Sequence, residues 1–121
     1  MNRLLIAAAC SVLFLLPVAS HAQRAISLHA RTAEDLAQLC AANPRDQRGD
    51  AQVNFCHGFA QGVADTMIGL LEKPFCFPNP PPTRAATLAQ FVDWVKAVPD
   101  HSKLPAARGF ATFLRERFPC K

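Results

Sequence analysis

The sequence predicts a small all-α domain, a disulfide-stabilised bundle of about four helices. Four segments carry apolar residues at helical spacing, and no stretch alternates apolar and polar residues as an exposed strand would. Beyond an apolar leader at the start of the chain, four cysteines remain, an even number that is typical of two disulfides in a short exported protein. A domain this short buries only a modest core, so covalent reinforcement is expected.

Residues 1–22 have the features of a secretory signal peptide. A positive start is followed by the apolar run "LLIAAACSVLFLLPVA" and by "SHA", whose small residues suit a cleavage site before Gln23. Lipid attachment at Cys10 is the weaker alternative, because the apolar run continues past that residue. No later segment is apolar enough to span a bilayer, so we expect no membrane anchor after cleavage. Residues 23–31 are then a flexible lead-in, and residues 32–121 form the folded domain.

Two helices are expected in the first half of the domain. Thr32 and Asp35 match a capping box, which predicts a helix that ends near residues 43–44. A second helix is predicted from about Ala51 to Leu71. Its apolar stripe consists of Phe55, Phe59, Val63, Met67 and Leu70. The following "KPFCFPNPPPT" excludes a helix and favours a stiff, extended loop, because proline fixes the backbone and lacks an N–H.

Two more helices are expected after this proline-rich loop. The third is predicted from Arg84 to Val98, where Pro99 stops it, and the fourth begins around Ser102–Pro105. The expected stripe of the third helix is Leu88, Phe91, Val92 and Val95. That of the fourth is Leu104, Ala107, Ala111, Leu114 and Phe118.

The order of the helices favours one pairing of the cysteines, although counting alone leaves three connectivities open. Short connections make neighbouring helices antiparallel, so the end of the first helix faces the start of the second. This favours Cys40–Cys56. It also favours Cys76–Cys120, because those two residues precede the third helix and follow the fourth. Each closed loop would add roughly 3 to 4 kcal/mol in the chain-entropy account.

No catalytic or metal-binding pattern is found, so we expect no enzyme and no cofactor. Cys56 and His57 are adjacent, which points their side chains about 100° apart on a helix, too far for the imidazole to activate the thiol. The cysteines are too widely spaced for a zinc site. Asp65 has no second acid near it in sequence. The mild positive charge is spread along the chain, which argues against nucleic acid as a partner.

The second helix carries an unusual face of small residues. Gly58, Gly62, Asp65 and Gly69 fall on one side, and glycine inside a helix costs about 1 kcal/mol relative to alanine. Close packing by another helix of the same chain is the favoured explanation, and a groove for a partner is the alternative. Asp65 is expected to accept hydrogen bonds or to pair with an arginine across this seam.

Several motifs together resemble a known family. "CHGFAQGVAD" resembles the C-x-G-[YF]-x-x-G-[VI]-x-D signature of the Rap/Tai-type immunity proteins, and "FCFP", "VPD" and "FPC" resemble its later elements in the same order. The resemblance implies a small helical periplasmic protein, often dimeric, that binds a type VI secretion peptidoglycan amidase and occludes its active site without doing chemistry. One departure is Phe59, where the family often has tyrosine.

The resemblance assigns scaffold roles, and the loop suggests a binding surface. Carried over onto this chain, the scaffold residues are the motif cysteines together with Gly58, Gly62, Asp65, Pro78 and Pro119. We expect partner contacts from the loop residues Phe77, Asn79, Pro80, Pro81 and Pro82, because a rigid loop loses little entropy on binding. Replacing Phe77 by aspartate is expected to weaken binding without unfolding the domain.

Two other functional classes compete with the immunity role. One is a periplasmic stress chaperone of the small acid-activated type, which is also helical and disulfide-bonded. The other is an orphan binding or structural domain with no toxin as its target. Acid-triggered client binding would favour the chaperone, whereas a neutral-pH complex with one protein would not. Neighbouring genes that encode an amidase would separate the immunity protein from the orphan domain.

Overall fold

The computed structural model describes residues 28–121, so the predicted signal peptide and residues 23–27 of the lead-in lie outside the described part. The elements are α1 (Ala33–Cys40), α2 (Gln47–Leu70), α3 (Arg84–Ala97), α4 (Pro99–Ser102) and α5 (Ala106–Arg117). Within the described residues, β-structure is limited to an isolated antiparallel bridge between Thr32 and Pro105. The all-α prediction is confirmed, with one short helix more than expected.

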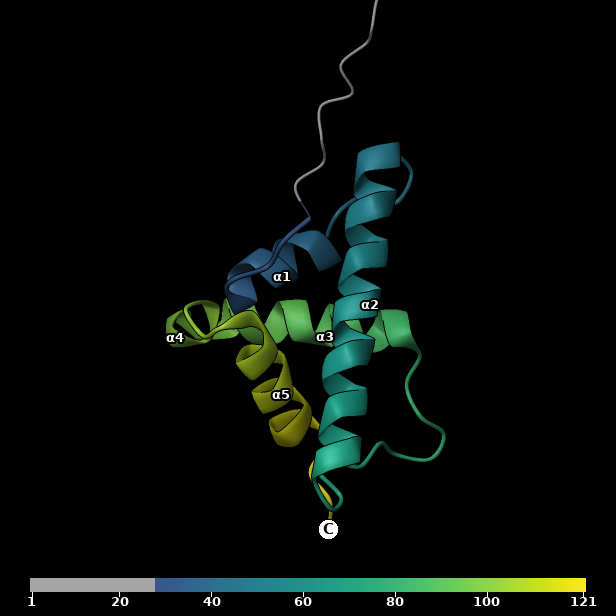
Figure 1. Ribbon diagram of the computed structural model, residues 1–121, viewed down its shortest axis with the longest axis vertical. Coiled ribbons are helices and arrows are strands. Elements are labelled where there is room, and N and C mark those ends of the chain that lie inside the picture. The colour runs from purple at the N-terminus through teal and green to yellow at the C-terminus, as the bar shows by residue number, and fades with distance from the viewer. Residues whose placement is uncertain (1–27) are drawn as a thin grey trace, which may run out of the picture.

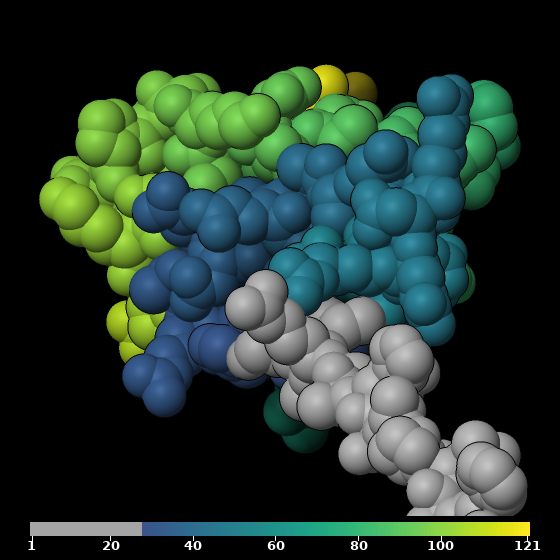
Figure 2. Space-filling model, turned by 90° about the horizontal axis from the view of Figure 1, so that it is seen from above, coloured from purple at the N-terminus to yellow at the C-terminus, as the bar shows by residue number. Residues whose placement is uncertain are grey.

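Helix α2 runs along the longest axis of the molecule (Figure 1), with α1, α4 and α5 on one side of it and α3 crossing behind it. Seen from above, α1 lies against α3 and α4, with the start of α2 beside α1 (Figure 2). The lower end of α2 continues into the proline-rich loop, close to the C-terminal residues. The molecule therefore has a helical end and a loop end, and the loop end holds the predicted contact residues.

The N-terminus of α1 is fixed by the expected capping box. Thr32 Oγ1 accepts a hydrogen bond from the Asp35 N–H at 3.1 Å, and Asp35 Oδ2 accepts from the Thr32 N–H at 2.9 Å. The Arg31 N–H also donates to Asp35 Oδ2, at 3.0 Å. The hydrogen bonds from the backbone of Thr32 and then of Arg31 lower the pKa of Asp35 below its usual range, because they stabilise the carboxylate form.

This cap makes stability depend on pH at the acid end. Because the folded-state pKa of Asp35 is depressed, its contribution is present above the unfolded-state pKa, about 3.9, and is lost as pH falls through the lower folded-state pKa. We expect Asp35→Asn to unfold at a lower temperature than the native chain at pH 7, and the difference to shrink below pH 4. Thermal unfolding followed by circular dichroism at both pH values measures this, and an equal difference at pH 7 and pH 3 would contradict it.

Helix α2 begins at Gln47, four residues before the predicted start. Asp46 is its N-cap, and its Oδ1 accepts a hydrogen bond from the Gly49 N–H at 2.7 Å. A side chain at Gly49 would collide with the backbone carbonyl of Asn43, so only glycine lets the preceding loop fold back this closely. The polar segment between α1 and α2 is therefore shorter than the sequence suggested.

Helices α3 and α5 are separated by α4, a single turn that was not predicted. Pro99 stops α3, as expected, and also supplies the first residue of α4. His101 holds this turn in place: its ring stacks on Trp94 at 3.7 Å between centroids, and its Nδ1 donates to the Trp94 carbonyl at 2.8 Å. Pro105 is the N-cap of α5 and not its first residue, so that helix begins later than predicted.

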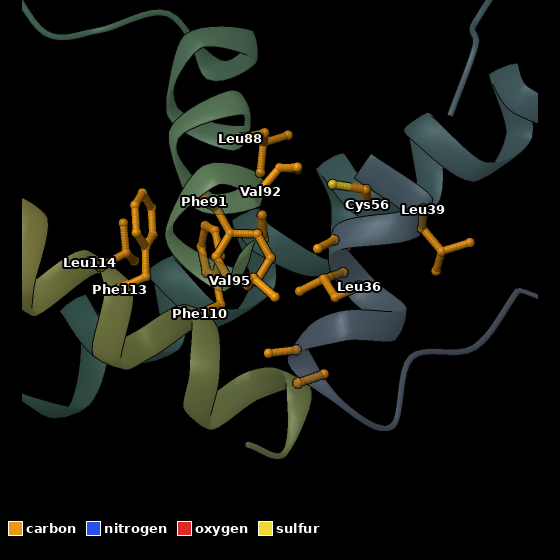
Figure 3. Close-up of a cluster of buried hydrophobic side chains, with 14 of the residues drawn as sticks. Leu36, Leu39, Cys56, Leu88, Phe91, Val92, Val95, Phe110, Phe113 and Leu114 are labelled. Atoms are coloured by element: carbon orange, nitrogen blue, oxygen red, sulfur yellow. The ribbon is translucent and has the colours of Figure 1, made fainter. Parts of the chain in front are cut away.

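The core is an apolar cluster shared by all the longer helices (Figure 3). Phe91, on α3, lies 5.1 Å from Phe110 and 5.5 Å from Phe113, both on α5, measured between ring centroids. The four predicted residues of α3 are all buried. On α2 the most buried side chains are Cys56, Ala60 and Met67, while the predicted Leu70 is 78 % exposed. The stripe predicted for α2 is therefore partly wrong.

Helix α5 meets the start of α1 at a close contact. A Cβ built on Gly109 would lie 2.7 Å from Ala33 Cβ, so glycine is needed at that position for the two helices to approach. The backbone reinforces the contact, because the Ala33 N–H donates to the Leu104 carbonyl and the Ala106 N–H donates to the Arg31 carbonyl. In the predicted stripe of the last helix, Leu114 and Phe118 are buried as expected, whereas Ala107 is exposed. Gly109, Phe110 and Phe113 are also buried, although the stripe did not include them.

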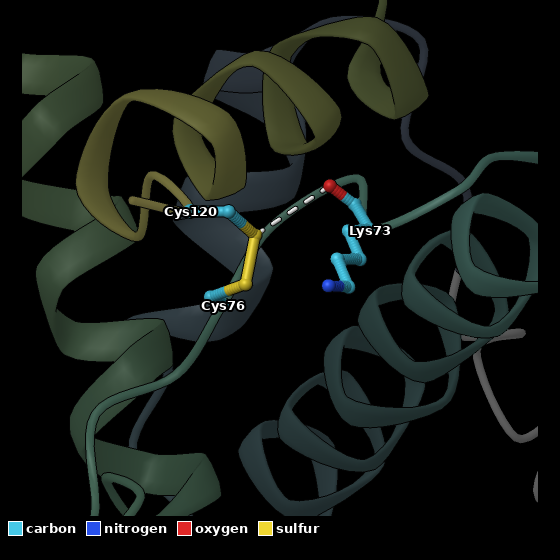
Figure 4. Close-up of a disulfide and its surroundings, with 3 residues drawn as sticks. All are labelled: Lys73, Cys76 and Cys120. Carbon is cyan, nitrogen blue, oxygen red and sulfur yellow. Dashed lines mark hydrogen bonds between the residues drawn. A yellow bond between two sulfur atoms is a disulfide. The ribbon is translucent and has the colours of Figure 1, made fainter.

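Two disulfides reinforce the domain, one between α1 and α2 and the other at the loop end. Cys40 is joined to Cys56 and Cys76 to Cys120, the two pairs that the antiparallel arrangement favours. Cys56 is fully buried, whereas Cys76 is exposed. Figure 4 shows Cys120 Sγ beside the carbonyl oxygen of Lys73, at 3.5 Å. A disulfide sulfur carries no hydrogen, so this is a packing contact that seats the bond against the turn after α2.

Candidate partner-binding surface

The proline-rich loop, residues 71–83, is anchored at its middle and open at its tip. The Cys76 N–H donates to the Phe118 carbonyl at 2.8 Å, and the Cys76–Cys120 disulfide joins the same two segments. Phe75 is buried in the core. The residues that follow, 76–81, are all exposed. The loop is therefore held rigidly while its tip faces outward, as a contact surface requires.

Phe77 has a mixed role within this loop. Its ring is 43 % exposed, yet it packs edge-on against Phe118 at 4.7 Å and against Phe75 at 5.3 Å between centroids. Edge-to-face pairs of this kind stabilise a fold by about 0.5–1.5 kcal/mol beyond area burial. Phe77→Asp is therefore expected to cost some stability through lost packing, in addition to weakening binding.

Two grooves include Phe77 in their lining. The α2 groove, about 220 Å³, runs between α2 and the start of α3. The loop groove, about 650 Å³, runs between the loop and the C-terminal segment. Residues of the α2 groove are Ala60, Gln61, Ala64, Asp65, Ile68, Phe75, Phe77, Pro82, Arg84, Thr87, Leu88, Phe110 and Leu114. Those of the loop groove are Cys76, Phe77, Pro78, Pro80, Pro82, Gln90, Arg117, Phe118, Pro119 and Lys121.

The predicted contact residues are divided between these features. Phe77 and Pro82 line both grooves, and Pro80 lines the loop groove. Asn79 and Pro81 are exposed and line neither. The structure thus places all five of these residues at the loop end of the molecule, on one continuous segment.

A polar bridge crosses the α2 groove. Gln61 Nε2 donates to Asp65 Oδ1 at 2.7 Å, and Arg84 Nη2 donates to Gln61 Oε1 at 3.3 Å. Asp65 was expected to meet an arginine across a helix seam, and it does so only through Gln61. The bridge connects α2 to the first turn of α3.

Exposed apolar side chains are concentrated at the same end. Ile68 is 60 % exposed and Leu70 is 78 % exposed, and Leu71 follows them at the start of the loop. Single exposed apolar residues are common on protein surfaces, but a group beside a rigid loop is typical of an interaction surface. Sequence reasoning missed this group because it assigned Leu70 to the core.

The glycine face of α2 does not pack against another helix of the described chain. A Cβ built on Gly58, Gly62 or Gly69 would meet nothing within 4 Å among residues 28–121. The favoured explanation, intramolecular helix packing, is therefore wrong for this face. Of the other family-motif residues, Pro78 and Pro119 both line the loop groove.

Residues 28–121 show no arrangement suited to metal binding or to thiol chemistry. No group of three or more His, Cys, Asp or Glu side chains converges within this range. All four of its cysteines are in disulfides, and a sulfur in a disulfide cannot act as a nucleophile. None of the helices between Ala33 and Arg117 combines the length and apolarity needed to cross a bilayer.

The comparisons with known proteins give one match. The model of a family described as Rap1a immunity proteins matches residues 32–120, from the N-cap of α1 to the last cysteine. A search of curated proteins found no match, and neither did a search of solved structures.

Proposed function

The chain belongs to the Rap1a immunity protein family, and on that premise we propose that it binds a peptidoglycan amidase effector of a type VI secretion system and occludes its active site. The observation that carries this proposal is the family match over residues 32–120, because it covers the whole helical domain. Membership of an immunity family implies a protein partner. Our proposal adds three points to family membership. The partner is an amidase, the protein is periplasmic after signal-peptide cleavage, and this chain does no catalysis itself.

The loop end of the molecule is the proposed contact surface. It combines a disulfide-anchored loop, exposed apolar side chains and two grooves, all beside one another. A rigid, partly apolar surface binds with little loss of entropy and excludes water from the centre of the interface. Occlusion requires no chemistry from this chain.

The direct test is binding and inhibition at neutral pH. Purified, oxidised residues 23–121 would be mixed with a panel of periplasm-targeted amidases, and both affinity and peptidoglycan cleavage would be measured. Stoichiometric inhibition of one amidase is the expected result. Sedimentation of the free chain in the same buffer tests whether it forms the homodimer that the family resemblance implies.

A loop variant tests where the partner binds. We expect Pro81→Glu to weaken amidase binding roughly tenfold, because it adds a charge and removes rigidity at an exposed position of the loop. Titration calorimetry measures the affinity. The matched control is Gln38→Glu, which introduces the same charge at an exposed position of α1. Equal affinities for the two variants would remove the loop tip from the interface.

The result of the panel also decides between the functional classes. Inhibition of one amidase at neutral pH excludes the chaperone and orphan alternatives. Failure to bind any amidase, with client binding appearing only on acidification, would overturn the immunity proposal in favour of the chaperone. The family match favours the immunity role, and no observation on the described residues favours the chaperone.

A further inference from the structure

The loop groove has a one-sided charge. Arg117 and Lys121 are among its lining residues, and no aspartate or glutamate is. The nearest acid along α5, Glu116, is engaged on another side of the helix, where its Oε2 accepts a hydrogen bond from Trp94 Nε1 at 2.8 Å. The apolar part of the lining comes from prolines and from the rings of Phe77 and Phe118. The groove therefore offers an apolar wall beside the Arg117 guanidinium.

Arg117 is held in place by a residue from a different helix. Its Nε donates to Gln90 Oε1 at 2.6 Å, which connects the last turn of α5 to the middle of α3. A guanidinium has five N–H groups, and this hydrogen bond uses one of them. The N–H groups on the two Nη atoms have no hydrogen-bond or ion-pair partner among residues 28–121. The cation is thus oriented in the free protein, with its remaining donors available.

We infer that Arg117 is the carboxylate-binding anchor of the loop groove, and that the effector segment seated there carries an aspartate or glutamate next to an apolar side chain. The inference rests on the proposed function, since it specifies the chemistry of the same partner. The carboxylate accepts two parallel hydrogen bonds from Arg117, and the apolar side chain packs on Phe77 and the prolines. An arginine oriented in advance loses little rotamer entropy when it forms such a pair.

The expected effect is large because charge and shape both depend on Arg117. Arginine is over-represented among residues whose loss costs an interface most, and a bidentate pair enclosed by apolar groups is such a case. We expect Arg117→Ala to weaken amidase binding roughly 30-fold or more. Arg117→Lys keeps the charge but not the planar fork, so it should restore only part of the affinity.

The matched control lies two residues earlier on the same helix. Arg115 is exposed, shares the last turn of α5 and does not line the groove, since it points about 200° away around the helix. Arg115→Ala removes the same charge from the same helix end, so it should leave affinity within about twofold of the native value. Thermal unfolding of both variants, measured alongside, separates binding from folding.

Gln90 is a positioning residue, and its test needs a different readout. Gln90→Met keeps the size of the side chain but removes the acceptor, so Arg117 must be ordered on binding, at a cost of roughly threefold to tenfold in affinity. In the Arg117→Ala background the same change should have no effect on affinity. The dependence of affinity on salt should also become weaker in Arg117→Ala and stay unchanged in Gln90→Met.

The outcomes separate this inference from the proposed function. If the native chain binds no amidase in the panel, both are overturned. If the native chain binds tightly and Arg117→Ala binds as tightly as Arg115→Ala, the assignment of Arg117 as the carboxylate-binding anchor is wrong, while the immunity role stands. A solved complex with a basic or uncharged segment in the groove would also overturn the inference.

Discussion

Replacing Phe113 by alanine is expected to lower the free energy of unfolding by about 4 kcal/mol. The side chain is fully buried, and its ring lies 5.5 Å from Phe91, 5.7 Å from Phe110 and 6.0 Å from Phe118. Its removal leaves a cavity between α3 and α5 that these rings cannot fill without leaving their rotamers. Phe118 also packs against Phe77, so the loss of packing should extend to the loop end.

Urea unfolding at pH 7 measures this loss directly, as a shift of the midpoint at unchanged slope. The control is Leu70→Ala, at a position 78 % exposed, which should change stability by less than about 0.5 kcal/mol. A loss of less than 1 kcal/mol in Phe113→Ala would mean that the aromatic cluster repacks and does not behave as a single well-packed unit.

Removal of the Cys76–Cys120 disulfide is the second change with a large expected effect. The two residues are separated by 44 positions, and closure of a loop of that length stabilises a fold by about 4 kcal/mol in the chain-entropy account. We expect Cys76→Ser with Cys120→Ser to lose stability of this order. We also expect amidase binding to weaken, because the loop then keeps only non-covalent ties to the C-terminal segment, the Cys76 N–H to Phe118 hydrogen bond and the packing of Phe77 on Phe118.

Two measurements distinguish these effects. Urea unfolding gives the global loss, and hydrogen exchange of the amides in residues 71–83 reports the local opening of the loop. The comparison is Cys40→Ser with Cys56→Ser, which removes the disulfide between α1 and α2 and leaves the loop tied. Loop exchange that rises equally in both double variants would show that the Cys76–Cys120 disulfide has no special role in holding the loop.

Local sequence signals predicted most of the helices. Thr32 with Asp35 marked the start of α1, and the stripe of α3 was correct because Leu88, Phe91, Val92 and Val95 face the core at regular spacing. The start of α2 was missed because Asp46 is one of several capping residues in a polar loop. The α4 turn was missed because four residues carry no periodicity.

The faces of α2 could not be predicted, and the reason is geometric. This helix is long and extends past the other helices (Figure 1), so its last turns bury Met67 on one side and leave Leu70 exposed on the other. Periodicity identifies an apolar stripe but not where the core ends, which is why Leu70 was misassigned. The same geometry leaves Gly62 and Gly69 open, although their spacing suggested a packed seam.

The loop was recognised from its prolines, but the anchor beside it was not. Phe77, Pro80 and Pro82 stand together in the sequence, whereas Gln90 and Arg117 are 27 residues apart and on different helices. No spacing rule connects them. Their contact depends on the packing of α3 against α5, which only the folded chain provides.

The Cys76–Cys120 disulfide also affects what happens when a protease cuts the chain. It encloses α3, α4 and α5, so a single cut within this stretch, for example after the exposed Lys103, divides the backbone but leaves both pieces covalently joined. The aromatic cluster between α3 and α5 continues to hold them in register. A nicked molecule would run as one band without reductant and as two bands with it, and it would still present an intact loop end.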